Sequence, residues 1–203
     1  MSEYHVPVLL NESVSALNIE ENRNGIFIDA TFGGGGHSRE ILSRLAEKGK
    51  LIAFDRDSDA IANAPKDKRL ILIHNNFRFV QNFVRQLGFI GKIDGILGDL
   101  GVSSHQFDTG ERGFSFRFDA PLDMRMNQLA PKSAANVVNE YSQEDLTRIF
   151  KIYGELDKPW KAAELICKAR ENSPIETTGD LSKAVEKLYT NFTEHKFLAK
   201  LYQ

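Results

Sequence analysis

The sequence predicts an α/β fold built on a parallel sheet, followed by a region that is entirely helical. Between residues 25 and 101, short apolar runs rich in β-branched residues alternate with segments in which apolar residues recur at helical spacing. A glycine-rich turn follows the first of these runs, and the apolar pattern after residue 126 is helical throughout. The 203 residues are enough for one sizeable core, or for one domain that carries an insertion.

Four short apolar runs are expected to form the strands of the sheet. They cover residues 26–29, 51–54, 70–73 and 93–97, and helix-period segments separate them. The connections between runs and helices are short, which is typical of βαβ units. Consecutive βαβ units place their strands parallel in one sheet.

Two hydroxyl-x-x-acid patterns predict helix starts in the second half of the chain. They begin at Ser142 and Thr177, and each precedes apolar residues at helical spacing. We expect residues 1–126 to form the α/β part and residues 127–203 to form a helical part, with the boundary near Met126. The stretch 102–126 lacks periodicity, but its phenylalanines, among them Phe107, Phe114 and Phe116, argue against disorder and favour a functional loop.

Composition excludes several classes of protein. Apolar residues make up 41% of the chain, and no apolar run approaches the roughly 20 residues that span a bilayer, so we expect a soluble, cytoplasmic chain without a membrane partner. One cysteine and five scattered histidines argue against a disulfide framework and against a metal site. A net charge of −2 offers phosphates no general attraction, so any nucleic-acid recognition must be local.

A glycine turn follows the first predicted strand, where open parallel sheets bind their ligands. It runs from Gly33 to Gly36. A dinucleotide-binding turn needs a third glycine, and Ser38 or Arg39 stands at that position, which weakens an NAD-binding interpretation. The pattern of Asp29, three residues and then Gly-x-Gly resembles the first motif of class I methyltransferases, which bind S-adenosylmethionine.

Polar or aromatic residues follow the other strands. Asp55 ends the second strand, where a carboxylate accepts hydrogen bonds from ribose hydroxyls; the alternative is a helix N-cap. Phe77 follows the third strand and either stacks on an adenine or packs in the core. His37, beside the glycine turn, is either a ligand contact or a helix-start residue.

Asp99 follows the fourth strand at the same predicted edge. The lone pair of an exocyclic amine on a nucleobase is delocalised into the ring, so the amine is a poor nucleophile. A carboxylate that accepts its N–H bonds would orient it and favour a more reactive nitrogen. The sequence leaves open whether Asp99 acts in catalysis, holds the cofactor or caps the following turn.

Seven segments resemble the signature of the RsmH (MraW) family, whose members methylate the exocyclic N4 of a cytosine in small-subunit ribosomal RNA. The resemblance covers essentially the whole chain. The segments are His5–Leu10, Asp29–His37, Asp55–Asp57, Asp99–Ser104 with Gln106, Glu111–Phe116, Asp119–Met126 and Tyr153–Glu155.

The resemblance implies a class I (Rossmann-like) S-adenosylmethionine-dependent methyltransferase sheet, with the all-helical part inserted in it to help grip RNA. It also implies a small-subunit ribosomal RNA or small ribosomal subunit as partner, and it leaves a homodimer open. Family members run on to complete the sheet, so the chain resembles a C-terminally truncated fragment. The implied cofactor contacts are Gly35, Gly36, His37, Asp55, Phe77, Asp99 and Gln106.

Arginines and aromatic residues alternate in the 102–126 loop, and we expect this loop to receive the target base. In the alternative, the arginines pair with nearby carboxylates and only hold the loop together. An NAD-dependent oxidoreductase and a non-enzymatic RNA-binding module are the competing functions. The candidate substrate-binding residues are Arg112, Phe114, Phe116, Arg117 and Arg125.

Overall fold

The computed structural model describes residues 7–62 and 64–203, so His5 and Val6 of the N-terminal family motif lie outside the described residues. The chain divides into two compact units. The first contains the chain up to Ser103 together with Met126–Gln128, and the second contains Ser104–Arg125 with Leu129–Gln203. In the described part of the chain, no helix is both long and apolar enough to cross a membrane.

The first unit is built on a four-stranded parallel sheet with the strand order β3-β2-β1-β4. The strands lie where the apolar pattern predicts them, which confirms an α/β fold with a parallel sheet. The fourth strand is shorter than predicted, since it begins at Gly95 and not at residue 93. Before Gly95, the side-chain carboxylate of Asp94 accepts the N–H of Ile26, in place of a backbone carbonyl of a paired strand. The strands are β1 (Ile26–Asp29), β2 (Lys50–Asp55), β3 (Leu70–His74) and β4 (Gly95–Leu97).

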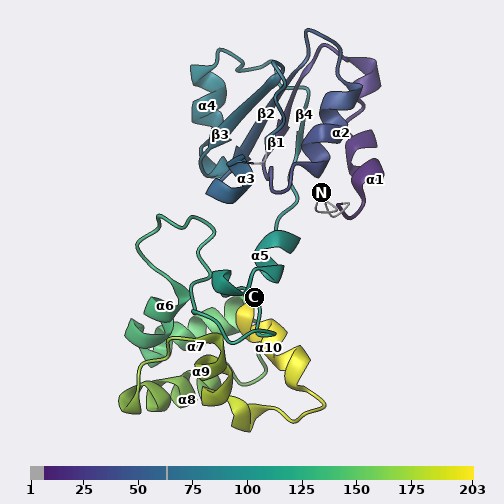
Figure 1. Ribbon diagram of the computed structural model, residues 1–203. Helices are drawn as coiled ribbons and strands as arrows, with labels where there is room; N and C mark the ends of the chain where they lie inside the picture. Colours follow the sequence, from purple (N-terminus) through teal and green to yellow (C-terminus); the bar gives the residue numbers. More distant parts are fainter. Residues whose placement is uncertain (1–6, 63) are drawn as a thin grey trace. The chain divides into compact units, whose positions relative to one another are not determined.

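Helices pack on both faces of this sheet (Figure 1). Alternate strand residues point to opposite faces. Phe27 and Leu51 pack with Ile41 of α2 on one face, whereas Ile28 packs with Val84 of α4 on the other. The helical elements of this unit are α1 (Leu10–Ser15), η1 (Ile19–Glu21), α2 (Gly36–Arg44), α3 (Ser58–Ala62), η2 (Phe77–Phe79) and α4 (Val80–Gln86).

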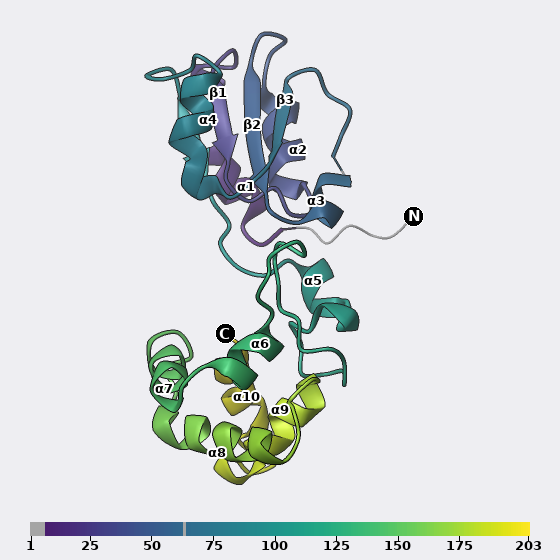
Figure 2. The same ribbon diagram turned by 90° about the vertical axis from the view of Figure 1, so that its left-hand side faces the viewer.

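The second unit is helical, and Figure 2 shows α6–α10 gathered around one core. Leu146 of α7, Ile166 of α8 and Leu198 of α10 are among its fully buried side chains. Both predicted helix starts are confirmed: Ser142 accepts the N–H of Asp145, and Thr177 forms a capping box with Asp180. The elements are α5 (Ser104–Asp108), η3 (Gly110–Arg112), α6 (Ala134–Glu140), α7 (Gln143–Ile152), α8 (Pro159–Asn172), α9 (Thr178–Ala184), η4 (Glu186–Leu188) and α10 (Glu194–Tyr202).

The 104–125 segment packs with the helical unit. Leu122 lies in the helical core, its N–H donates to the carbonyl of Glu176, and its carbonyl accepts the N–H of Ala135. By packing, the helical unit therefore begins at Ser104, ahead of the boundary near Met126 that we predict from the sequence. The division into a methyltransferase domain, residues 1–126, and an inserted helical domain, residues 127–203, stays a prediction.

Candidate functional site at the carboxyl edge of the sheet

The glycine turn joins β1 to α2 at the carboxyl edge of the first unit. Gly33 and Gly35 have φ angles of 51° and 76°, which favour glycine. A Cβ on Gly35 would lie 2.8 Å from the Phe32 ring, whereas a Cβ on Gly33 would meet nothing closer than 3.9 Å. The N–H of Phe32 donates to the carbonyl of Phe54, and that of Ala30 donates to the carbonyl of Leu97, so both neighbouring strands hold the turn.

Two carboxylates flank the glycine turn. Asp29 of β1 pairs with Ala53 on β2 and with Leu97 on β4, and Asp55 and Asp99 each lie two residues beyond those partners. Neighbouring strands are about 4.8 Å apart, so the Cα atoms of Asp55 and Asp99 are on the order of 10 Å apart across β1. The edge is therefore acidic on both sides of a backbone turn.

Asp55 is fixed by the backbone on both of its oxygens. Oδ2 accepts the N–H of Gly33 at 2.7 Å, and Oδ1 accepts the N–H of Asp57 at 2.8 Å. An ionised carboxylate offers about four acceptor positions, so about two remain for a ligand. The N-cap alternative for Asp55 is wrong, since Asp57 precedes α3 and accepts the N–H of Asp59.

His37 connects α2 to the end of β4. It is the second residue of α2, its side chain is only 7% exposed, and its Nδ1 lies 4.0 Å from Oδ2 of Asp99. The other ring nitrogen, Nε2, is buried and has no hydrogen-bond partner among the described residues. A buried polar atom without a partner is costly, which makes Nε2 a candidate contact for a ligand atom or a water.

Asp29 lies beneath the turn and is fully buried. Its carboxylate accepts the hydroxyl of Ser38 at 2.6 Å and the N–H of Thr31 at 3.0 Å. Burial raises the pKa of Asp29 above its ordinary value, and these hydrogen bonds offset only part of that effect. The ionised form is therefore less favourable in the fold than in the unfolded chain.

This sign predicts a pH dependence of stability. The contribution of Asp29 is fully present below the ordinary pKa of 3.8 and is lost as pH rises through the raised value. Relative to the wild type, Asp29→Asn should gain free energy of unfolding as pH rises from about 4 to about 8. Asp67→Asn is the control: Arg69 lowers the pKa of Asp67 to about 2, so its difference from wild type should stay constant above about pH 5. Denaturant titrations measure both, and parallel pH profiles would contradict the role given to Asp29.

Phe77 follows β3 in the short helix η2. It is 38% exposed and does not belong to the buried cluster on that face of the sheet, so the core-aromatic alternative is wrong. The side chain of Asn76 caps η2 by accepting the N–H of Arg78 at 2.9 Å. A half-exposed aromatic ring beyond the carboxyl end of β3 is available for stacking.

The remaining predicted site residues lie in the second unit. Gln106 of α5 is buried, and its role as a cofactor contact stays a prediction. Phe114 is buried, and Phe116 packs edge-on against Tyr202 with ring centroids 5.7 Å apart. Both phenylalanines therefore have a packing role in this structure, and contact with a base stays a prediction.

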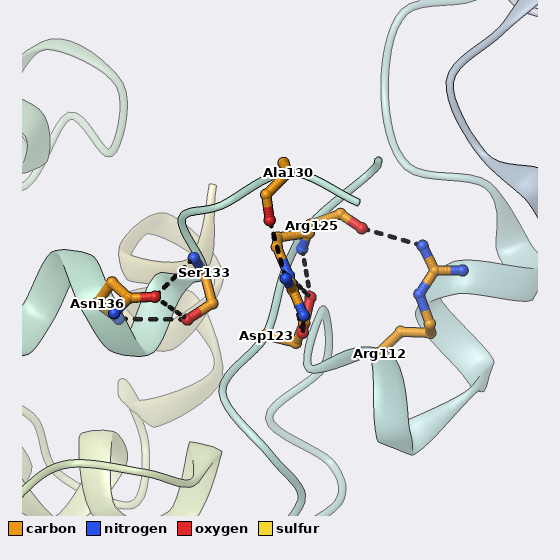
Figure 3. Close-up of polar contacts among 6 residues, drawn as sticks. All are labelled: Arg112, Asp123, Arg125, Ala130, Ser133 and Asn136. Carbon is orange, nitrogen blue, oxygen red and sulfur yellow. Dashed lines mark hydrogen bonds and ion pairs between the residues drawn. The ribbon is translucent and has the colours of Figure 1, made fainter. Parts of the chain in front are cut away.

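The arginines of the loop differ in exposure. Arg112 is 7% exposed and donates from Nη2 to the carbonyl of Arg125 (Figure 3). Arg125 binds the carboxylate of Asp123 through Nε and Nη2 and the carbonyl of Ala130 through Nη1. These contacts agree with the alternative in which the arginines hold the loop together. The side chain of Arg117 is 59% exposed, lies over the Phe107 ring at 4.8 Å, and is 3.9 Å from Asp108.

Thr31, Ser38 and Arg39 were missed as site residues. Thr31 and Ser38 bind Asp29, and the Arg39 guanidinium donates to the carbonyl of Gly34 at 2.7 Å. Their closeness to the glycine turn in the sequence was the available signal. In the part of the chain that the structure describes, no group of three or more His, Cys, Asp and Glu side chains could hold a metal ion.

This combination of a parallel sheet, a glycine turn and acidic strand ends is typical of α/β proteins that bind nucleoside-containing ligands at the carboxyl edge. Residues 2–203 match the model of the MraW methylase family, and the chain belongs to that family.

Three relatives, each named ribosomal RNA small subunit methyltransferase H, are similar over nearly the whole chain. The protein from Flavobacterium johnsoniae is 54% identical over 201 residues, which are 99% of this chain and 66% of the relative. The protein from Parabacteroides distasonis is 51% identical over 98% of this chain and 65% of its own length. That from Christiangramia forsetii is 52% identical over 100% of this chain and 66% of its own length. The chain thus spans about two thirds of the length of these relatives.

Proposed function

We propose that the protein transfers a methyl group from S-adenosylmethionine to the exocyclic N4 of a cytosine in small-subunit ribosomal RNA, in the cytoplasm. The acidic edge carries the proposal, because Asp55 and Asp99 flank a backbone turn that is suited to a small ligand. Family membership and the names of the relatives support the same activity.

The charge of this edge distinguishes between ligands. Two carboxylates beside the glycine turn would repel the pyrophosphate of a dinucleotide. S-adenosylmethionine has no phosphate; it carries ribose hydroxyls, which donate to carboxylates, and a sulfonium and an ammonium group, which carry positive charge. The buried Nε2 of His37 offers a further polar contact. The edge therefore fits S-adenosylmethionine better than NAD, and membership of a methylase family argues against the oxidoreductase alternative.

Each residue of the edge has a role in this proposal. Asp55 would accept the ribose hydroxyls on its remaining acceptor positions. Gly35 and Gly36 would contact the ligand through their backbone, and Phe77 would stack on the adenine. His37 would bind through Nε2. Gln106 is kept as a cofactor contact on the family resemblance alone.

S-adenosylmethionine, when bound, supplies a methyl group that is activated by its bond to a positively charged sulfur. Asp99 would accept N–H bonds from the exocyclic amine of cytosine, orient it and stabilise the positive charge that develops on N4. The exposed carboxylate of Asp99 leaves room for such a contact. After transfer, N4 releases one proton.

The helical unit is proposed to recognise RNA as a domain inserted in a class I methyltransferase sheet. A net charge of −2 gives no general attraction to phosphates, so individual exposed cations must provide the contacts. Arg117 fits this role, because its guanidinium is exposed beside an aromatic ring. Arg112, Phe114, Phe116 and Arg125 would shape the loop that presents it.

Arg117→Ala is expected to impair RNA methylation by on the order of tenfold without changing stability or cofactor affinity, since it removes an exposed charge. Arg112→Ala is the matched comparison. It removes a buried side chain and the donor to the carbonyl of Arg125, and it should lower the free energy of unfolding by about 1–3 kcal/mol. Methylation kinetics and thermal unfolding of both variants measure these effects. An equal loss of stability in the two variants would mean that Arg117 has a structural role and does not bind RNA.

One experiment tests the proposed function. Methyl transfer from labelled S-adenosylmethionine is measured with the full-length protein on small ribosomal subunits that lack the modification, followed by nucleoside analysis. We expect label in N4-methylated cytidine. RNA binding without transfer would favour a non-enzymatic RNA-binding module, and binding of NAD instead of S-adenosylmethionine would favour an oxidoreductase. Light scattering of the protein alone tests whether it forms the homodimer that the family resemblance leaves open.

A further inference from the structure

A ring of polar contacts joins the ends of β1 and β4 to the start of α2. Asp29 accepts the Thr31 N–H and the Ser38 hydroxyl, and Oγ1 of Thr31 accepts the N–H of Asp99 at 2.7 Å. The Asp99 carboxylate closes the ring at His37, which precedes Ser38 in α2. Thr31 is the member that binds both Asp29 and Asp99.

The segment around Asp99 has little else to hold it. Asp99 lies beyond the end of β4, its side chain is 64% exposed, and the structure shows two polar contacts for it in the described part of the chain. Gly98 precedes it and Gly101 follows shortly after, and a Cβ on Gly101 would meet no atom within 4 Å. Two glycines so close to Asp99 give the backbone of this segment more accessible conformations than other residues would. Since the His37 contact is 4.0 Å long, the short hydrogen bond to Thr31 is the stronger restraint.

We propose that Thr31 is the positioning residue for Asp99. Its hydroxyl anchors the Asp99 backbone and so holds the carboxylate within hydrogen-bond reach of the place where the target amine must lie. This inference rests on the proposed function, because it gives a purpose to the placement of Asp99. Catalytic groups lose much of their effect when they are displaced by about 1 Å, so a single backbone anchor can control turnover without touching the substrate.

Two substitutions at Thr31 separate this role from a structural one. Thr31→Val keeps the branched shape and the backbone N–H that binds Asp29, but it removes the acceptor for Asp99. Thr31→Ser keeps that acceptor. Hydrogen exchange of the Asp99 amide is measured by NMR, together with kcat, KM for RNA and the Kd for S-adenosylmethionine, all in the full-length protein.

In Thr31→Val we expect exchange of the Asp99 amide to accelerate on the order of tenfold, and kcat to fall by a similar factor, because one hydrogen bond is lost. Affinity for S-adenosylmethionine should stay within about twofold, and Thr31→Ser should behave as the wild type in every measurement. Unchanged hydrogen exchange of the Asp99 amide in Thr31→Val would show that the Thr31 hydroxyl does not anchor the Asp99 backbone. An equal loss of kcat in both variants, or a loss of cofactor affinity in step with kcat, would overturn the positioning role.

The exchange measurement requires no enzymatic activity, so it distinguishes failure of this inference from failure of the proposed function. If the wild type transfers no methyl group to any RNA, the proposed function fails, while faster exchange in Thr31→Val would still establish the anchor. If the wild type is active and Thr31→Val matches it in kcat, the proposed function stands and the positioning role is overturned.

Discussion

Asp99→Asn is expected to slow methyl transfer by about 100-fold or more while leaving the affinity for S-adenosylmethionine nearly unchanged. Asparagine keeps the shape and one acceptor but removes the negative charge that would stabilise the developing charge on N4. The Asp99 side chain is largely exposed, so the substitution should not disturb folding. Single-turnover kinetics at saturating cofactor, combined with calorimetric titration of the cofactor, measure the two quantities separately.

Glu47→Gln provides a matched loss of one exposed carboxylate in the same unit, since Glu47 pairs only at the surface with Lys68. It should leave both rate and affinity unchanged. If the affinity of Asp99→Asn for the cofactor falls in step with its rate, Asp99 is a cofactor ligand and its catalytic role is wrong. If the rate does not change, Asp99 has neither role in the chemistry.

Asp55→Ala is expected to weaken binding of S-adenosylmethionine by about 1.5–3 kcal/mol. The substitution removes charge-assisted hydrogen bonds to the ribose. It also removes the acceptor for the N–H of Gly33, so the glycine turn itself loses a restraint. Both effects act in the same direction, which favours the upper part of the range. Calorimetry on a variant whose circular dichroism matches the wild type measures the loss.

Asp57→Ala is the control for this experiment, because Asp57 caps α3 from the same loop. Losing that cap should lower the free energy of unfolding by about 1 kcal/mol. Cofactor affinity should not change. If folded Asp55→Ala binds S-adenosylmethionine with unchanged affinity, Asp55 does not bind the ribose.

Much of the fold could be predicted from local sequence pattern. Short continuous apolar runs predicted the place of all four strands; the central strands β1 and β2 are buried on both faces and so need apolar side chains along their length. The helix starts at Ser142 and Thr177 were predictable because an N-cap depends on residues only three positions apart. The common edge of Asp55 and Asp99 followed from parallel pairing, since carboxyl ends of parallel strands meet at one side.

The sequence by itself therefore determined the strands, the helix starts, the glycine turn and the edge on which the acidic residues lie, since each depends on short-range pattern. Only the tertiary structure decided the partners of these residues. Thr31 and Asp99 are 68 residues apart, and the burial of Phe116 depends on Tyr202 in the last helix. Exposed and buried arginines look alike in the 102–126 loop, because the exposure of a side chain depends on distant segments that pack against it.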